Sequence, residues 1–402
     1  MNLMQRLSPI CLIVALMGCQ DPTVAPQVNE GRARPVRDVN PDVGCPLTAT
    51  VTVTDEASLR AAILAARPGD VIAVRGTIAI ATDDTILTPD ITITCATIGS
   101  GLVATGTNVT DMLTVGASGV IVDRLALDGT LAGDSPFLAT NDGIALFAQN
   151  IRFTNNTVTC AAFGLCVFIA GGTGAVITDN SFHAGDPLSG IHLQANGPDP
   201  SAAFLPIRVD GARVQRNTLV ATSPTSFFRF GAIRPFDADD LVITDNTISG
   251  AWRNGISAVR MSHSRIRGNQ IQGVLEAGIR TSDGNPANPL GEVADNLFVA
   301  NLVIGSGKAG VFAQLACRNL FVANHLEDNA GDVGVLLDGT TGANVVAGVE
   351  NAAVIDNGAF DCDGDGDTDP NVITGGARRQ EAAPADMASS DPVRRVQGIP
   401  VQ

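Results

Sequence analysis

The densest group of potential ligand atoms in the sequence is a run of aspartates near the C-terminal end. The carboxylates occupy alternate positions: Asp361, Asp363, Asp365, Asp367 and Asp369. Carboxylates this close together repel one another unless a cation lies between them. Asp361, Asp363 and Asp365, followed by glycine, fit the first half of an EF-hand calcium loop, although Val372 replaces its final glutamate. We therefore predict a structural calcium site of the isolated aspartate-rich kind, with a solvated acidic turn as the alternative.

A second set of polar side chains could act on an acidic sugar. They occur at comparable places in a repeated phrase: His192, Gln194, Arg234, Ser257, Arg280 and Gln314. Removing the proton next to a uronate carboxylate requires a base, and positive charge to stabilise the enolate. The sequence has no tyrosine, so the base could only be His192, an arginine or Lys308. If such a reaction occurs, we expect His192, Arg234 and Arg280 to be the catalytic residues. If it does not, these side chains belong to an ordinary solvated sheet face.

A repeated four-residue phrase must position these side chains. It consists of glycine, an apolar residue, a residue of any type and a second apolar residue. Its first copy is at residues 143–146 and its last at 334–337. An asparagine phrase recurs alongside it, at Asn156, Asn180, Asn217, Asn246, Asn269, Asn296 and Asn324. A period of this size, built from short strands, predicts a stacked solenoid. We interpret the asparagines as structural, because identical amides on successive coils can hydrogen-bond as a ladder.

One amphipathic helix is expected before the strands begin. Residues 54–66 place Leu59 and Ile63 on one helical face, and Thr54 or Asp55 can cap the start. A helix there would cover the open apolar end of the solenoid and prevent end-to-end pairing.

These features resemble right-handed parallel β-helix proteins of the pectate-lyase-like superfamily, over residues 51–375. The resemblance implies an all-β solenoid, here of about ten three-strand coils with an N-terminal capping helix. It implies no single activity, since the scaffold carries lyases, hydrolases and adhesins. In enzymes of this superfamily the substrate groove runs along the outside of one sheet. If the glycine phrases form that sheet, Cys166, His192, Ala232, Ser257 and Arg280 make one outward column.

A second outward column, two residues further along each strand, then holds Gln194, Arg234 and Gln314. We expect Gln194, Ser257 and Gln314 to contact substrate. Trp252 could stack on a sugar ring, or it could pack over the edge of the core. Glycoside hydrolysis is less favoured: residues 140–144 are similar to one polygalacturonase motif, but the later paired aspartates of that family are missing.

The charge balance limits the possible partners. The chain holds 41 acidic and 25 basic residues, a formal net charge of −16. We expect no nucleic acid partner, because phosphate binding requires a basic face. Anionic glycans would also be repelled, unless calcium or a local arginine cluster reverses the sign. We expect a monomer.

The N-terminal segment resembles a bacterial lipoprotein signal. An apolar run too short to span a bilayer ends in Leu16-Met17-Gly18-Cys19, similar to a lipobox. The resemblance implies cleavage before Cys19 and acylation of that residue, with an ordinary secretory signal peptide as the alternative. We predict a signal peptide (1–18), a tether (19–44), the β-helix (45–375) and a tail (376–402). Either signal exports the protein, and the lipobox places it in the cell envelope, held to the membrane by lipid only.

Six cysteines remain once Cys11 and Cys19 are set aside. An even set in an oxidising compartment predicts disulfides. Proximity in sequence and coil favours Cys45–Cys95, Cys160–Cys166 and Cys317–Cys362, although the outward column leaves Cys166 as a possible free thiol.

Two functions follow from the sequence. The first is an exported protein that binds polysaccharide or cell-envelope glycan without an identifiable catalytic motif. The alternative is a polysaccharide lyase that acts on uronate-containing glycans through the His/Arg residues of the outward columns.

Overall fold

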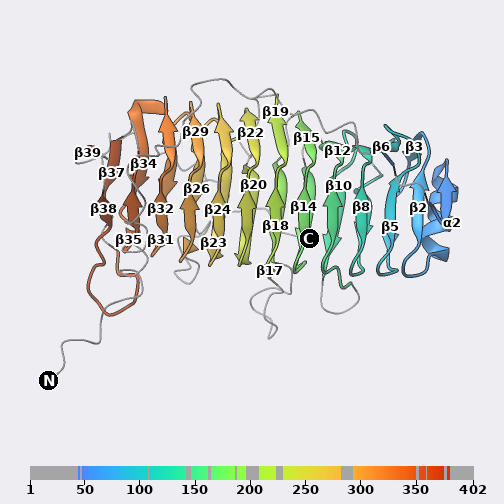
Figure 1. The fold of residues 1–402 in the computed structure, drawn as a ribbon, viewed down its shortest axis with the longest axis horizontal. Helices are drawn as coiled ribbons and strands as arrows, with labels where there is room; N and C mark the ends of the chain where they lie inside the picture. Colours follow the sequence, from blue (N-terminus) through green and yellow to red (C-terminus); the bar gives the residue numbers. More distant parts are fainter. Residues whose placement is uncertain are drawn as a thin grey trace, which may run out of the picture. The chain divides into compact units, whose positions relative to one another are not determined.

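The protein is a parallel β-helix whose coils stack along one axis (Figure 1). The computed structural model describes residues 44–380, with gaps at 46–47, 107, 142–145, 162–163, 186–187, 196–207, 223–229, 282–292, 350–352, 359 and 375–377. All strands pair in parallel, in three sheets of 13, 10 and 16 strands that we name A, B and C. The predicted all-β solenoid is confirmed. Sheets A and C have more strands than the roughly ten coils that we predicted. The predicted signal peptide and Cys19 lie outside the described residues, as do residues 142–144 of the segment similar to a polygalacturonase motif.

Sheet A forms one side of every coil. Its strands, in spatial order, are β1 (Val51–Val53), β2 (Val71–Val74), β5 (Thr92–Cys95), β8 (Ile121–Asp123), β11 (Arg152–Thr154), β14 (Val176–Thr178), β18 (Arg213–Gln215), β21 (Val242–Thr244), β24 (Arg265–Arg267), β28 (Leu297–Val299), β32 (Leu320–Val322), β36 (Val345–Ala347) and β38 (Val372–Thr374).

Sheet B follows sheet A in each coil after a tight turn. Its strands are β3 (Thr77–Ile80), β6 (Gly101–Ala104), β9 (Ala126–Asp128), β12 (Thr157–Thr159), β15 (Ser181–Ala184), β19 (Thr218–Ala221), β22 (Thr247–Gly250), β25 (Gln270–Gln272), β29 (Leu302–Ile304) and β33 (His325–Glu327).

Sheet C contains the glycine phrases. Its main path is β4 (Asp84–Ile86), β7 (Asp111–Val115), β10 (Ser135–Thr140), β13 (Leu165–Ala170), β16 (Ser189–Gln194), β20 (Gly231–Asp239), β23 (Asn254–Ser262), β26 (Ile279–Thr281), β30 (Val311–Ala313), β34 (Val333–Leu337), β37 (Ala353–Asp356) and β39 (Arg378–Gln380). Four short strands extend it: β17 (Val209–Asp210), β27 (Val293–Ala294), β31 (Ala316–Cys317) and β35 (Thr341–Gly342). β39 falls in the segment predicted as tail and pairs with β37.

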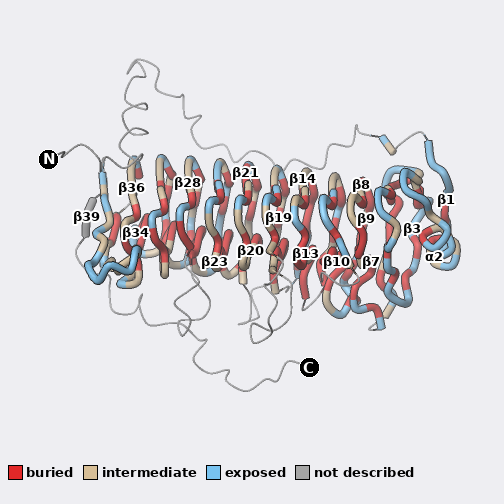
Figure 2. The backbone as a smooth tube through the Cα atoms, turned by 90° about the horizontal axis from the view of Figure 1, so that it is seen from below, coloured by how far each residue is buried: buried red, intermediate tan, exposed pale blue. Residues whose placement is uncertain are grey.

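Buried residues recur in every strand of the three sheets' main paths up to β37, along the length of the solenoid. In Figure 2 they are the red segments of the backbone trace. In the three-residue strands the middle residue is buried, because successive side chains of a strand point to opposite faces. Equivalent residues of neighbouring coils therefore stack. Phe298 and Phe321, for example, lie with their ring centroids 4.7 Å apart.

The predicted capping helix is confirmed as α2 (Glu56–Ala65), at the end of the stack beside β2 and β3. Asp55 is its N-cap: the Ser58 backbone N–H donates to Asp55 Oδ1 at 2.8 Å. Leu59 and Ile63 are buried against the first coil. The other helical element is the short 3-10 turn η1 (Ala330–Asp332). Within the described residues, no helix is long and apolar enough to cross a membrane.

The asparagines form two ladders rather than the one we expected. The first lies at the turn from sheet A to sheet B and comprises Asn156, Asn180, Asn217, Asn246, Asn269, Asn301 and Asn324. Each side-chain Nδ2 donates to Oδ1 of the next asparagine, at 2.9–3.1 Å. Their predicted structural role is confirmed, since all are buried and hydrogen-bonded.

The second ladder lies at the turn from sheet C to sheet A. It comprises Asn296, Asn319, Asn344 and Asn371. Assigning Asn296 to the first ladder was therefore wrong. Both turns place a residue with positive φ directly before the asparagine, as at Asp295 and Ala300, so one local pattern serves both turns.

The three predicted disulfides are present: Cys45–Cys95, Cys160–Cys166 and Cys317–Cys362. Cys166 is fully buried and bonded, so its assignment as an outward, possibly free thiol was wrong.

We predict that Asn246→Ala destabilises the fold by about 2–4 kcal/mol, because it leaves buried polar groups unpaired. Asn246 accepts from the Asn217 backbone N–H at 3.0 Å and donates to the Val214 carbonyl at 2.9 Å. Gln270→Ala, at an exposed position of β25, is the control and should change stability by less than about 0.5 kcal/mol. Chemical denaturation measures both, and equal midpoints would show that the ladder contributes no net stability.

Candidate functional site

One row of outward side chains crosses the middle of sheet C. The strand register places Phe168 beside His192 and His192 beside Arg234. It also places Ser257 beside Arg280 and Arg280 beside Phe312. Because Ile233 pairs with Ile256, Arg234 lies next to Ser257. His192, Arg234, Ser257 and Arg280 thus occupy four successive strands, β16, β20, β23 and β26.

The predicted columns contained a register error. Arg234 belongs to the row of His192, where we had placed Ala232 and Cys166. The pairing of Ile191 with Ile233 puts Ala232 beside Gly190, and the pairing of Val167 with Ile191 puts Cys166 there too. A slip of two residues keeps the side of the sheet but changes the row. Gln194 lies in the adjacent row as predicted, beside Phe236.

His192 is buried, with 5% of its surface exposed. Its Nε2 lies 3.0 Å from Gln194 Oε1, and the edge of its ring faces Phe168 at 5.2 Å between centroids. Burial and the neighbouring charge of Arg234 lower the pKa of His192 to about 3. The imidazole is therefore neutral at physiological pH. With Nε2 donating to Gln194, Nδ1 is a buried acceptor without a partner among the described residues.

Arg234 is half-buried between aromatic rings. Its guanidinium carbon lies 3.5 Å from the ring centroid of Phe230 and 5.4 Å from that of Phe236. No carboxylate of the described residues pairs with it. Burial lowers the pKa of Arg234 to about 10, so the side chain keeps its charge at neutral pH. It is a cation held on an apolar surface with its hydrogen-bond donors available.

Arg280 belongs to a cationic cluster around a single carboxylate. Glu276 Oε2 lies 3.1 Å from Arg280 Nη1 and 3.1 Å from Arg253 Nε. Its Oε1 lies 3.3 Å from Lys308 Nζ. Burial alone would raise the pKa of Glu276, but the charges of Arg253 and Lys308 hold it below its usual value. Three cations therefore meet at one carboxylate, a local concentration of positive charge in an acidic chain.

Sequence patterns did not single out Glu276 or Arg253 as members of the site. Both precede glycine phrases in connecting turns. Glu276 is four residues before Arg280, but only the stacking of coils brings Arg253 and Lys308 to the same carboxylate. Lys308 had been considered only as a possible base. Arg280 Nη2 also donates to Gln314 Oε1 at 3.3 Å, which links the two predicted residues.

Three of the predicted site residues, Ser257, Arg280 and Trp252, are buried. Ser257 is 6% exposed and Arg280 is 8% exposed, so the row is not an ordinary solvated sheet face. Trp252 is 1% exposed, and the prediction that it stacks on a sugar is wrong. Its indole packs inside the coil near Gly190, where an added Cβ would lie 3.2 Å from the ring.

The aspartate run forms a loop between β37 and β38. Both carboxylate oxygens of Asp361 accept backbone N–H groups, from Gly364 at 2.7 Å and Gly366 at 2.8 Å. Carboxylate oxygens of Asp361, Asp363 and Asp369 lie within 4.8 Å of one another. Three hard oxygen donors in this arrangement suit calcium. The predicted ligands Asp365 and Asp367 are not part of this group.

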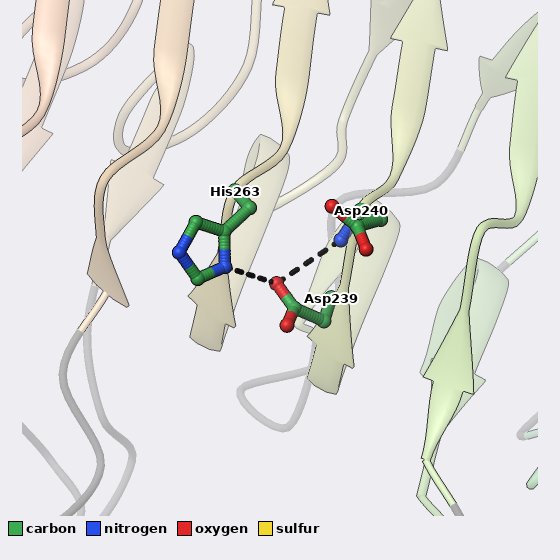
Figure 3. A group of neighbouring side chains, drawn as sticks. All are labelled: Asp239, Asp240 and His263. Carbon is green, nitrogen blue, oxygen red and sulfur yellow. Dashed lines mark hydrogen bonds and ion pairs between the residues drawn. The ribbon is translucent and has the colours of Figure 1, made fainter.

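A second possible metal-binding group was not predicted. Asp239, Asp240 and His263 lie at the turn from sheet C to sheet A, with ligand atoms within 4.8 Å of one another (Figure 3). His263 Nδ1 is 2.9 Å from Asp239 Oδ1. The hydrogen bond to Asp239 raises the pKa of His263. Asp239 and His263 are thus already hydrogen-bonded to each other, and a cation would have to displace that hydrogen bond.

Residues 208–358 match the protein family described as right handed beta helix region. No curated protein matches the sequence. Solved structures with a similar chain path include the A-module of a mannuronan C-5 epimerase from Azotobacter vinelandii, at 16% identity over 82% of this chain and 94% of that chain, with a TM-score of 0.48. A PL6 family polysaccharide lyase from Pseudopedobacter saltans shares 11% identity over 88% of this chain and 98% of that chain, with a TM-score of 0.43.

A Dettilon tailspike protein shares 14% identity over 82% of this chain, with a TM-score of 0.49, and this chain spans 66% of it. The family match and the parallel register together identify the fold as a right-handed parallel β-helix.

We predict that calcium raises the melting temperature by a few degrees through the aspartate loop, because a ligand that binds only the folded state stabilises it. Asp361→Asn with Asp363→Asn should abolish this shift in differential scanning fluorimetry. Asp365→Asn with Asp367→Asn changes the same charge outside the three-carboxylate group and should keep the shift. Loss of the shift in both pairs would instead indicate a diffuse response to acidic charge.

We predict that His192 stays neutral on acidification well below its ordinary pKa of 6.5. The unfolded chain binds the proton first, so the stability associated with neutral His192 is complete above pH 6.5 and is lost as the pH falls toward 3. Its ring resonances should not titrate between pH 7 and pH 5 in NMR spectra. His192→Gln should therefore flatten the fall in unfolding free energy over that window.

His263→Gln is the control of opposite sign. The pKa of His263 is raised, so its contribution is present at low pH and is lost as the pH rises through the folded-state pKa. Parallel pH profiles for the two variants would contradict the assignment of a buried, neutral His192.

Proposed function

We propose that this protein binds an acidic polysaccharide or cell-envelope glycan along the outer face of sheet C. The observation that carries the proposal is the cationic character of that face. Arg234 has no carboxylate partner among the described residues, and Arg253, Arg280 and Lys308 gather around Glu276. In a chain of net charge −16, such a surface attracts carboxylates that the rest of the molecule repels.

The spacing of the row suits a linear polymer. Strands lie about 4.8 Å apart, so His192 to Arg280 spans about 14 Å. Phe168 and Phe312 flank these residues at either end, about 24 Å apart, and both rings are half-buried. Polar centres with aromatic ends are typical of sites where carboxylates and hydroxyls bind in the middle and sugar rings pack at the margins.

Burial divides the row into two kinds of residue. Arg234, Gln194 and Gln314 are partly exposed and are the groups that a ligand reaches directly. His192 and Arg280 are buried and act as positioning residues, because they hold the amides of Gln194 and Gln314. Amides fixed in this way present their free donors to the ligand without a further loss of side-chain entropy.

A uronate lyase is the second candidate, favoured by the place of Arg234 beside His192, in the row where a carboxylate would bind. A base must have a pKa near the working pH, and His192, at about 3, is too weak a base at neutral pH. Arg234, lowered to about 10, is protonated at neutral pH and becomes a base only at alkaline pH, after it loses its own proton. In this alternative neutral Arg234 removes the proton at alkaline pH, and Arg280 contributes positive charge to the enolate.

The protein's location and anchoring are also proposed. Three disulfides form in oxidising compartments, which supports export. Cleavage before Cys19 and acylation there would tether the β-helix to a membrane of the cell envelope. Calcium at Asp361, Asp363 and Asp369 would hold the last coils and take no part in binding glycan.

We predict that Arg234→Gln weakens binding of an oligogalacturonate by about tenfold or more, because one charge-assisted hydrogen bond is worth about 1.5–3 kcal/mol. Isothermal titration calorimetry on the folded domain measures this. Arg75→Gln removes an exposed arginine far from the row and is the control, with unchanged affinity expected. Wild-type affinity in Arg234→Gln would overturn the proposed site.

The same samples separate binding from catalysis. A rise in ultraviolet absorbance from unsaturated products, lost in Arg234→Gln, would establish the lyase. Retention of the oligomer without turnover would establish the binding protein.

A further inference from the structure

The outer face of sheet A carries a row of arginines at alternate strands. The register pairs Arg152 of β11 with Val176 of β14, and Val176 with Arg213 of β18. It continues from Arg213 to Val242 of β21, and from there to Arg265 of β24. Each arginine is exposed and precedes a buried residue, so its side chain points away from the core. Two strand steps separate neighbouring arginines by about 9–10 Å.

These arginines lack partners within the described part of the chain. No ion pair or side-chain hydrogen bond involves the guanidinium group of Arg152, Arg213 or Arg265, nor that of Arg267 in β24. Of the three acidic residues that line the hollows of this face, two are already engaged. Asp179 pairs with Arg216 through two hydrogen bonds of 2.7 and 2.8 Å, and Asp123 accepts from Thr154 and Asn155. The exposed Asp245 is the exception.

A second row alongside provides hydroxyl and amide groups. It runs through Thr154, Thr178, Gln215, Thr244 and Arg267. The face is hollowed in two places: one hollow is lined by Arg265, Arg267 and Thr244, among others, and the other by Arg152, Thr154 and Thr178, among others. Cations, hydroxyls and apolar valines therefore alternate along a shallow surface that follows the solenoid axis.

Exposed arginines keep a face soluble wherever they lie, but their alternation here has a further consequence. Arginines on adjacent strands would repel one another, whereas two strand steps exceed the screening length of physiological salt, about 8 Å. The arrangement thus places three arginines in one line with little electrostatic repulsion between them. It matches an extended uronate chain, in which successive sugars are turned over so that alternate carboxylates point to the same side.

We propose that the outer face of sheet A, from β11 to β24, binds an acidic linear polysaccharide. Its carboxylates meet Arg152, Arg213 and Arg265, and its ring faces pack on Val176 and Val242. This surface is separate from the row on sheet C and shares with the proposed function only the class of ligand. Single-stranded nucleic acid fits less well, because the outward residues of these five strands include no aromatic ring on which a base could stack.

Arg213→Gln with Arg265→Gln tests the proposal in the full exported chain. The double variant should bind an oligogalacturonate about fivefold more weakly, since exposed ion pairs contribute a few tenths to 1 kcal/mol each. The difference should shrink at high salt. Arg67→Gln with Arg75→Gln is the charge-matched control and should leave the affinity unchanged. Equal losses in the two pairs would show a net-charge effect and overturn the proposal.

A variant of sheet C distinguishes failure of this inference from failure of the proposed function. Arg234→Gln should leave a residual affinity that Arg213→Gln with Arg265→Gln then removes. If Arg213→Gln with Arg265→Gln binds with wild-type affinity, only the proposal for sheet A is overturned. This conclusion holds whether or not Arg234→Gln weakens binding. Binding of phosphatidylglycerol vesicles or of an oligothymidine that depends on Arg213 and Arg265, without glycan binding, would assign the face to another partner and overturn the proposal.

Discussion

Hydrogen bonds between buried asparagines hold the turns of the coils from Asn156 to Asn324, and the rows of side chains on the outer faces depend on them. At the turn from sheet A to sheet B the backbone leaves its strand ladder, and its polar groups would otherwise be buried without partners. Asn246 satisfies two of them, the N–H of Asn217 and the carbonyl of Val214. Because each asparagine also binds the next, the seven turns from Asn156 to Asn324 share one hydrogen-bonding pattern. The strands are thereby held in register, and straight rows of side chains follow on the outer faces.

Much of this architecture could be predicted from sequence because its determinants are local and repeated. A turn asparagine or an inward valine has the same role in successive coils, so it recurs in the sequence at the spacing of the coils. Predictions that depended on how strands of neighbouring coils align with one another were less reliable. Asn296 was placed in the wrong ladder because both turns use the same local pattern, and Arg234 was shifted by two residues because Ala232 occupies a glycine position.

The site depends on non-repeating residues, which explains why less of it was predicted. Glu276 contacts Arg253, Arg280 and Lys308, which come from three different coils. None of these residues recurs at the period of the coils, so the repeat pattern of the sequence does not reveal their contacts. Trp252 was misjudged for a related reason. A lone tryptophan in a connecting turn has the same sequence context whether it faces solvent or fills the space beneath a glycine, and only the neighbouring coil decides.

The ladder also defines one coil as the unit by which the solenoid can be lengthened or shortened. Asn246 and Asn269 are 23 residues apart, as are Asn296 and Asn319, and Asn301 and Asn324. Each asparagine bonds only to the coils directly above and below it. Duplication or deletion of one such segment would rejoin equivalent hydrogen-bonding groups and preserve the core. The length of the protein can therefore change in evolution by whole coils, each of which adds one more side chain to the rows on its faces.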